Sequence, residues 1–209
     1  MGRTGVAIDV TRHDVDSDVA HAELGGFTVS GAPVASVRSA MMGVMNDDAQ
    51  TAITQVTEQE AELVLTTFTH DDAWRLGSRL TELAIERDLP VTVDIRKGTQ
   101  QVFHAARPGT TPDNDSWVER KVRVVYRFGA SSYLVGLKAR AEGADFNATH
   151  DLSLQEYAAH GGAFPVRVAG VGIVGVVTVS GLAQQDDHAL VVEALRELVA
   201  AQGPSSDRG

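Results

Sequence analysis

The sequence predicts an α+β domain whose sheet is mostly antiparallel. Two pairs of strand-like segments support this fold class: residues 91–96 with 101–106, and residues 164–169 with 173–180. Segments in which apolar residues recur with a helical period separate these pairs. Hydrophobic residues make up 43% of the 209-residue chain, which is enough to form a core.

The chain divides into a central domain and two ends of different composition. Residues 1–44 hold short apolar pieces interrupted by glycines and Pro33, so we predict a poorly ordered extension with a transient strand near residues 27–29. The domain itself is predicted over residues 45–201. Gly, Pro, Ser and charged residues dominate positions 202–209, which predicts a disordered tail.

The first half of the domain is predicted to alternate helix and strand. Good helix formers occupy residues 47–62, and an apolar run at residues 63–67 predicts a short strand. Thr69 is a favourable N-cap for a helix that runs to about Arg87, because acidic residues occupy the first turn. The first strand pair follows as a hairpin, since Gly98 allows a tight turn within it.

The second half is predicted to hold four helices around the second hairpin. The first spans residues 115–128, and Ser131-Ser132 can cap the next, which ends near Ala141. A short helix is expected over residues 153–159, before the hairpin. The last helix begins near Gln184 and packs through regularly spaced Leu, Val and Ala residues.

Composition excludes several classes of function. The formal net charge of −10 argues against a general binder of nucleic acid or of anionic membranes. The chain has no cysteine, which removes thiolate nucleophiles and Cys-ligated metal centres. No apolar run approaches the roughly 20 residues that span a bilayer. Aspartates occupy the place of a signal peptide's apolar segment, so we predict a cytoplasmic protein.

One apparent nucleotide motif is better explained as a hairpin. Gly170, Gly172 and Gly175 match the spelling of a dinucleotide fingerprint. That fingerprint requires a helix to follow, so that backbone amides at the helix N-terminus meet the pyrophosphate. The residues that follow are rich in Val and Ile and predict a strand. We therefore interpret the glycines as a turn and a tolerated strand glycine.

The helix over residues 115–128 carries unusual charges. Its three arginines, Arg120, Arg123 and Arg127, form a stripe opposite the apolar face. We favour a solvated face or ion pairs with a neighbouring subunit over an anchor for a carboxylate or phosphate. Lys121 projects toward the apolar face and needs a partner, for which Asp94 is a candidate. Such a pair is either structural or part of a site.

Three histidines, His104, His160 and His188, fall in ordered segments, but none has the spacing of a metal site. His160 is followed by Gly161-Gly162, which lets backbone approach a ligand or another chain, or simply ends a helix. No catalytic residue can be assigned and no metal site is expected. Two acidic pairs at predicted helix starts are explained by capping: Asp113 with Asp115, and Asp186 with Asp187.

Four stretches of the domain are distinctive: DIRKGTQQVFHAARPGT, RKVRVVYRFGASS, EYAAHGGAFPV and GVGIVGVVTVSGLAQQDDHALVVEAL. On these stretches the domain resembles the UPF0303 group of the haem-degrading family, which is also described as GlcG-like or DUF336. It implies a GlcG-like, profilin-type domain with a five-stranded, mostly antiparallel sheet flanked by helices. It also implies a homo-oligomer and haem as a ligand. A cysteine-free chain would have to ligate haem iron through His, Tyr or Met.

Three functions follow from this resemblance. The first is a module that binds haem or a related small ligand through one histidine, and the second is an enzyme that degrades haem at the same site. The alternative is an oligomeric interaction or scaffold protein without catalytic activity. The candidate ligand-binding residues are Asp94, His104, Asn114, Lys121, Arg123, His160, Gly161 and Gly162.

Overall fold

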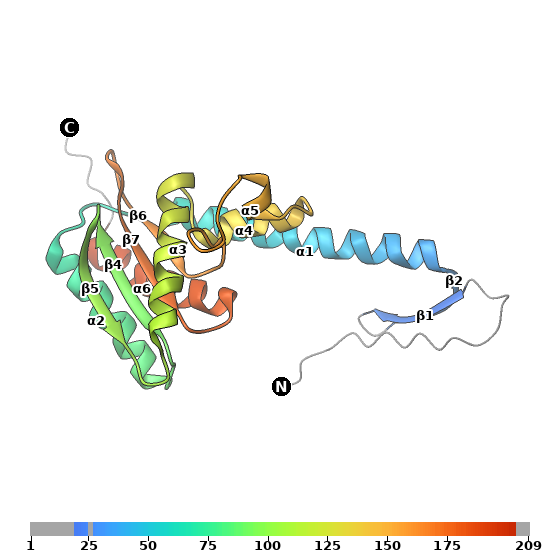
Figure 1. Ribbon diagram of the computed structural model, residues 1–209, viewed down its shortest axis with the longest axis horizontal. Coiled ribbons are helices and arrows are strands. Elements are labelled where there is room, and N and C mark those ends of the chain that lie inside the picture. Colours follow the sequence, from blue (N-terminus) through green and yellow to red (C-terminus); the bar gives the residue numbers. More distant parts are fainter. Residues whose placement is uncertain (1–18, 25–26, 204–209) are drawn as a thin grey trace. The chain divides into compact units, whose positions relative to one another are not determined.

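The structure, a computed structural model, describes residues 19–24 and 27–203 of the chain (Figure 1). Its helices are α1 (Val34–Glu62), α2 (His70–Glu86), α3 (Pro112–Phe128), α4 (Ser132–Ala141), α5 (Phe146–Thr149) and α6 (Gln184–Gln202). Its strands are β1 (Val19–Leu24), β2 (Phe27–Pro33), β3 (Val64–Leu65), β4 (Thr92–Lys97), β5 (Gln100–Ala106), β6 (Ala163–Val168) and β7 (Gly172–Ser180).

The central sheet has five strands in the order β3-β6-β7-β4-β5. Three of its four pairings are antiparallel, and only the short strand β3 runs parallel to its neighbour β6. Both predicted hairpins are present, as β4-β5 and β6-β7. The predicted α+β class with a five-stranded, mostly antiparallel sheet is therefore confirmed.

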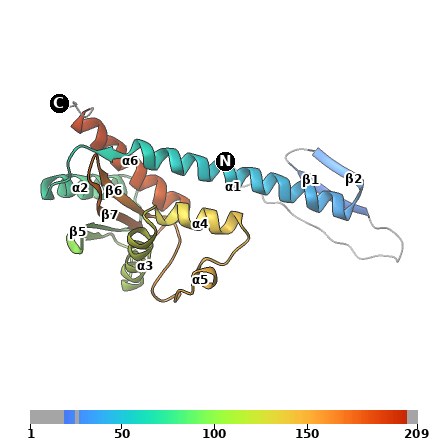
Figure 2. The same cartoon turned by 90° about the horizontal axis from the view of Figure 1, so that it is seen from above.

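Helices cover both faces of this sheet (Figure 2). Helices α2 and α6 pack on one face, where Leu76 and Leu80 meet Val93 and Ile95 in the largest apolar cluster. Helix α3 packs on the other face through a smaller cluster: Val118, Val122, Val125, Ala163 and Val176. Successive side chains of β4 point to opposite faces of the sheet. Val93 and Ile95 face the main core, so Asp94 between them faces α3.

The predicted starts of α2, α3 and α4 are confirmed with small shifts, whereas α1 begins at Val34, well before the predicted residue 47. Thr69 caps α2 in a reciprocal capping box, in which the Asp72 amide donates to Thr69 Oγ1 (3.1 Å) and the Thr69 amide donates to Asp72 Oδ2 (2.8 Å). Ser131 caps α4. Helix α3 begins at Pro112, three residues before the predicted start, because proline fits the first turn of a helix.

The prediction of a short helix over residues 153–159 is wrong. The helical turn lies earlier, at α5, and residues 154–156 form a turn stabilised by Ser153, whose hydroxyl accepts from the Gln155 amide (3.2 Å). The chain then runs beside α3, where the Ala158 amide donates to the Arg120 carbonyl (3.3 Å). Local turn chemistry and this tertiary contact outweigh the helix propensity of the alanines.

The turn between β6 and β7 contains the glycine motif. Gly170 and Gly172 have positive φ angles of 72° and 100° and lie at the hairpin turn. Gly175 lies within β7, where a Cβ atom would come within 2.2 Å of the Arg96 carbonyl oxygen. Strand β7, and not a helix, comes directly after the turn, so the interpretation as a hairpin is confirmed.

The predicted domain boundaries stay predictions. The chain divides into compact units after Gln50, and the boundary predicted after residue 44 falls inside α1. The described part of the first unit contains the β1-β2 hairpin and the start of α1, whereas residues 1–18 lie outside the described part. The poorly ordered extension predicted for residues 1–44 stays a prediction.

Helix α6 reaches the first residue of the segment predicted as a tail. Gln202 is the last residue of α6, and its Oε1 accepts hydrogen bonds from the amide and hydroxyl of Thr66, both at 2.9 Å. The rest of the predicted tail, residues 204–209, lies outside the described residues. In the described part of the chain, no helix combines the length and apolar character that crossing a membrane requires.

Candidate functional site

A pocket opens where the end of β7 meets the first turns of α3 and α6. Its volume is about 280 Å³. Its lining includes four side chains of helix α3, one of the loop before β6, and others of β7 and α6: Asp113, Asn114, Trp117, Lys121, His160, Ser180, Gln184 and Asp187. Most of these side chains are polar, so the pocket suits a ligand with several hydrogen-bonding groups rather than a purely apolar one.

A buried ion pair forms one wall of the pocket. Lys121 Nζ donates to Asp187 Oδ2 at 2.9 Å and to the Val179 carbonyl oxygen at 3.1 Å. Asp187 Oδ1 accepts from the Leu182 amide at 2.9 Å. Burial lowers the pKa of the Lys121 ammonium and raises the pKa of the Asp187 carboxyl, while their mutual attraction acts the other way on each. The donors around Asp187 favour the ionic form of the pair.

Two predictions about this wall are corrected. Lys121 pairs with Asp187 and not with Asp94, because its face of α3 lies over β7 and the start of α6. Asp187, which was interpreted as a helix-capping residue, is a buried partner of that lysine. The signal was present in the sequence, since Asp187 precedes Leu190 and Val191 by three and four residues and so shares their apolar face.

His160 lies at the rim of the pocket. Its ring packs edge-on against Trp117, with centroids 5.2 Å apart. Partial burial of the ring lowers its pKa, and the positive charges of Arg140, Lys121 and Arg120 lower it further. Neither ring nitrogen is hydrogen-bonded to another of the described residues, although the residue remains exposed. His160 therefore presents a neutral imidazole with an available lone pair at neutral pH.

The glycine pair after His160 serves packing inside the chain. A Cβ atom on Gly161 would lie 1.8 Å from the Gln184 carbonyl oxygen, at the start of α6. A Cβ atom on Gly162, whose φ is +122°, would lie 2.2 Å from the Val179 carbonyl oxygen. No helix precedes the pair, so helix termination is not its role. These close approaches explain both glycines without a ligand or a second chain.

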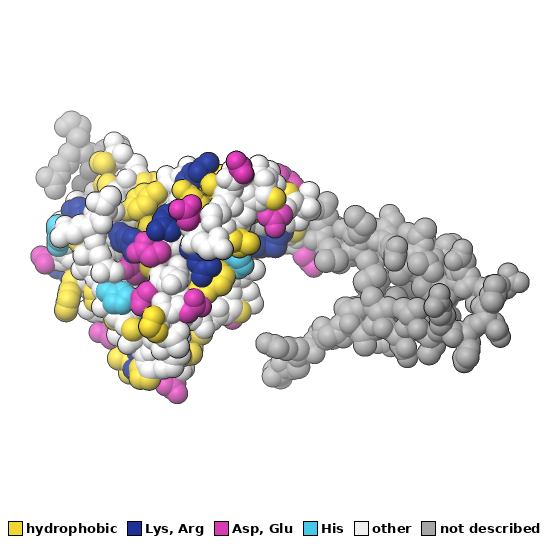
Figure 3. All heavy atoms as spheres, in the orientation of Figure 1, with side chains coloured by type: hydrophobic (Ala, Val, Ile, Leu, Met, Phe, Trp, Pro, Cys, Tyr) yellow, Lys and Arg dark blue, Asp and Glu magenta, His cyan; other side chains and the backbone are white. Residues whose placement is uncertain are grey.

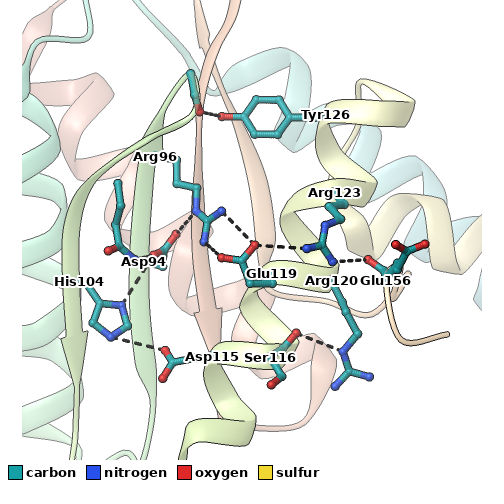
Figure 4. Close-up of polar contacts among 12 residues, drawn as sticks. Asp94, Arg96, His104, Asp115, Ser116, Glu119, Arg120, Arg123, Tyr126 and Glu156 are labelled. Atoms are coloured by element: carbon teal, nitrogen blue, oxygen red, sulfur yellow. Dashed lines mark hydrogen bonds and ion pairs between the residues drawn. The ribbon is translucent and has the colours of Figure 1, made fainter. Parts of the chain in front are cut away.

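A separate polar network lies between β4, β5 and α3 (Figure 4). Buried Asp94 accepts a hydrogen bond from Arg96 Nε at 2.9 Å, and His104 Nδ1 lies 3.7 Å from its second oxygen. Arg96 also pairs with Glu119, whose carboxylate lies 3.8 Å from an Arg123 nitrogen. The charge on Asp94 is thus satisfied within the chain, which makes the network structural.

The arginine stripe of α3 makes contacts within the chain. The Arg120 guanidinium lies 3.9 Å from the centroid of the Trp117 ring, close enough for a cation–π contact. Arg123 donates to the Glu156 carbonyl oxygen at 3.2 Å. Arg127 lies 5.5 Å from the centroid of the Tyr157 ring. The contacts of Arg123 and Arg127 hold the loop before β6 against α3 and so position His160.

Residues 68–196 match a protein family described as haem-degrading, HbpS-like. The chain belongs to this HbpS-like family. The family predicted from the sequence is confirmed.

Two Streptomyces relatives place the chain in the UPF0303 group of this family. A UPF0303 protein of Streptomyces coelicolor is 58% identical over 147 residues, which cover 70% of this chain and 93% of the relative. A UPF0303 protein of Streptomyces avermitilis is 56% identical over 154 residues, covering 74% and 94% of the two chains.

Solved structures share the HbpS-like fold. The crystal structure of Ybr137w superposes with a TM-score of 0.67 at 29% identity, covering 71% of this chain and 88% of that one. The Klebsiella pneumoniae protein ORFY, a DUF336 protein, superposes with a TM-score of 0.54 at 16% identity, covering 66% and 94% of the two chains. The GlcG-like fold expected from the resemblance is confirmed.

The structure of this HbpS-like chain separates the predicted site residues into two groups. Asn114, Lys121, His160 and Gly161 line the pocket, and Gly162 lies beside Lys121. The remaining three candidates, Asp94, His104 and Arg123, belong to the polar network. Their roles as ligand-binding residues stay predictions.

His188 lies outside both groups. It is buried, and its Nε2 pairs with Gln59 Oε1 at 2.9 Å. The sequence analysis gave no site role to four other residues that line the pocket: Asp113, Trp117, Ser180 and Gln184. Asp113 was explained as a capping residue, and Ser180 and Gln184 lie at element ends. In the described part of the chain, no cluster of three or more His, Asp or Glu residues is arranged to hold a metal ion.

Proposed function

We propose that this protein binds haem, with His160 as the ligand to the iron. The observation that carries the proposal is the state of that residue: an exposed imidazole, neutral at physiological pH and without a hydrogen-bond partner among the described residues. A neutral imidazole is the form that ligates iron. The description of the family as haem-degrading supports haem as the ligand, and one protein that shares the fold, at 16% identity, was solved as a PduOC–haem complex.

The surroundings of His160 suit the other parts of a haem. Two of the cations that lower its pKa, Arg120 and Arg140, can face the two propionate groups. The Trp117 ring beside His160 offers an aromatic edge for the macrocycle. Bound haem would supply iron redox chemistry, while these residues would hold and orient it.

The size of the pocket limits how a haem can bind. A volume of about 280 Å³ is below the range of roughly 300–1,000 Å³ that encloses a drug-sized ligand. The macrocycle would therefore lie across the rim, with His160 beneath it and much of its surface exposed to solvent. We expect reversible binding that is weaker than in a protein with an enclosed haem pocket.

A haem titration followed by absorbance tests the proposal. We expect a saturable Soret shift at about one haem per chain in the parent protein, and its loss in His160→Ala. His104→Ala is the matched control, because His104 is also partly exposed but lies in the polar network. Equal shifts in the parent and His160→Ala proteins would contradict the assignment of His160.

Haem degradation is a further step that needs its own measurement. The sequence assigns no catalytic residue, and the pocket offers Lys121 and Asp187 only as an ion pair. Loss of the Soret band over time in the presence of a reductant or peroxide, with release of iron, would identify an enzyme. A stable band under both conditions would identify a binding protein. A cytoplasmic location and the formation of a homo-oligomer remain predictions.

The surface on one side of the molecule suits a small ligand better than a polyanion. On the face drawn in Figure 3, Lys and Arg side chains are interspersed with Asp and Glu rather than gathered into one basic area. Together with the net charge of −10, this supports the prediction that nucleic acid is not a partner.

A further inference from the structure

Strand β5 forms an open edge of the central sheet. Among the described residues it pairs only with β4, so one side of its backbone has no strand partner (Figure 1). The other edge strand, β3, has two residues, whereas β5 has seven. Natural proteins protect long edges with charged side chains or proline, because an unpaired edge recruits other strands. Strand β5, with the sequence QQVFHAA, has no Lys, Arg, Asp, Glu or Pro, and the irregularity in its pairing with β4 is confined to a register shift at Val102.

An exposed tryptophan lies beside this edge. Trp74, on α2, is 64% exposed. Its ring contacts the ring of Phe103 of β5 edge-on, with centroids 5.6 Å apart. Phe103 is fixed in turn against α2, because a Cβ atom on Gly77 would lie 2.3 Å from its ring. Trp74 is thus held next to the edge with most of its surface in water. Tryptophan is among the residues most enriched at the centres of protein interfaces.

We propose that β5 and Trp74 form a two-fold interface between two copies of this chain, in which the β5 strands pair antiparallel and join two sheets into one. An antiparallel edge is complementary to itself, so a second copy supplies the strand that β5 lacks. A two-fold axis perpendicular to the sheet places both α2 helices on the same face. The two Trp74 side chains then face each other across the axis and are covered by the same contact.

The charge of the chain favours a second copy at this position. Each copy carries a formal net charge of −10, so most pairs of surfaces would repel. Strand β5 has no formally charged residue at neutral pH, which lets two copies approach there with little repulsion. This interface does not use His160 or the pocket, so it can be right or wrong independently of haem binding.

Light scattering of the full chain tests the interface. We expect a mass that is an even multiple of 22.2 kDa, and half that mass in both Trp74→Glu and Ala106→Lys, since Ala106 is an exposed residue of β5. The first change places two carboxylates across the axis, and the second adds the charge with which natural edges prevent pairing. Val171→Lys is the matched control, because Val171 is 71% exposed at the β6-β7 turn, away from β5, and its change should leave the mass unaltered.

Hydrogen exchange of the parent protein gives a second test that needs no variant. We expect the amides of β5 to exchange more slowly at a protein concentration where the mass has doubled than at one where it has not. A monomer at every concentration, or an assembly whose mass neither variant changes, would overturn the proposal. Fast exchange across all of β5 within an assembled protein would overturn it as well.

Discussion

The buried histidine on α6 makes the stability of the fold depend on pH. His188 is 4% exposed and lies between the rings of Tyr133 and Phe164, with centroids 4.9 Å and 5.7 Å away. Its Nδ1 atom is buried without a hydrogen-bond partner. Burial lowers its pKa from 6.5 to about 4, because a charged imidazole has little to solvate it there.

The size of the effect follows from the two pKa values. Between about pH 4 and 6.5 the unfolded chain binds more protons at this histidine than the folded chain, so the free energy of unfolding falls as the pH falls. At about 1.4 kcal/mol per pH unit, the full loss is about 3 kcal/mol, reached below pH 4. Between pH 7 and pH 5 the expected loss from this residue is about 2 kcal/mol.

Urea denaturation at pH 7 and pH 5 measures this effect. We expect His188→Gln to reduce the difference in unfolding free energy between the two pH values by about 2 kcal/mol relative to the parent protein. His70→Gln is the control, because His70 is exposed in the folded chain and its change should leave the difference unaltered. Equal pH dependence in His188→Gln and the parent protein would refute the reasoning.

Three further predictions concern the pocket wall and the first helix cap. Lys121→Met leaves the Asp187 carboxylate buried without its partner, and we expect thermal or urea denaturation to show a loss of about 3–5 kcal/mol; a loss below 1 kcal/mol would mean that the pair is dispensable. Gly161→Ala places a Cβ atom 1.8 Å from the Gln184 carbonyl oxygen, so a fall in melting temperature of several degrees is expected, and an unchanged value would show that the first turn of α6 can move. Thr69→Ala removes the capping box of α2 and should cost about 1 kcal/mol in the same assay, whereas Thr69→Ser should retain most of it.

The fold could be predicted because its signals are local. Alternation over β4, the glycines of the β6-β7 turn and the cap at Thr69 each depend on a few neighbouring residues, and each prediction is confirmed. The helix predicted at 153–159 failed because its backbone bonds to Arg120, more than thirty residues away in the sequence. Helix propensity contains no information about such a contact.

The partners within the site depended on tertiary structure. Lys121 was recognised as a charge on an apolar face, but its partner Asp187 is 66 residues away. The prediction that Asp94 pairs with Lys121 was wrong because the Asp94 carboxylate already accepts a hydrogen bond from Arg96, two positions along the same strand. His160 and Asn114 were both candidates from the sequence, and only the fold shows that they line one pocket. The spacing of residues in the sequence could not reveal this, since no motif links them.

Chemical rescue of haem binding tests the central claim most directly. The Soret spectrum of His160→Ala with haem would be recorded with and without added imidazole, beside that of the parent protein. If His160 ligates the iron, imidazole should restore the parent spectrum in the variant by entering the space left by the side chain. A variant that shows the parent spectrum without imidazole would contradict the claim, as would a parent protein that shows no saturable shift.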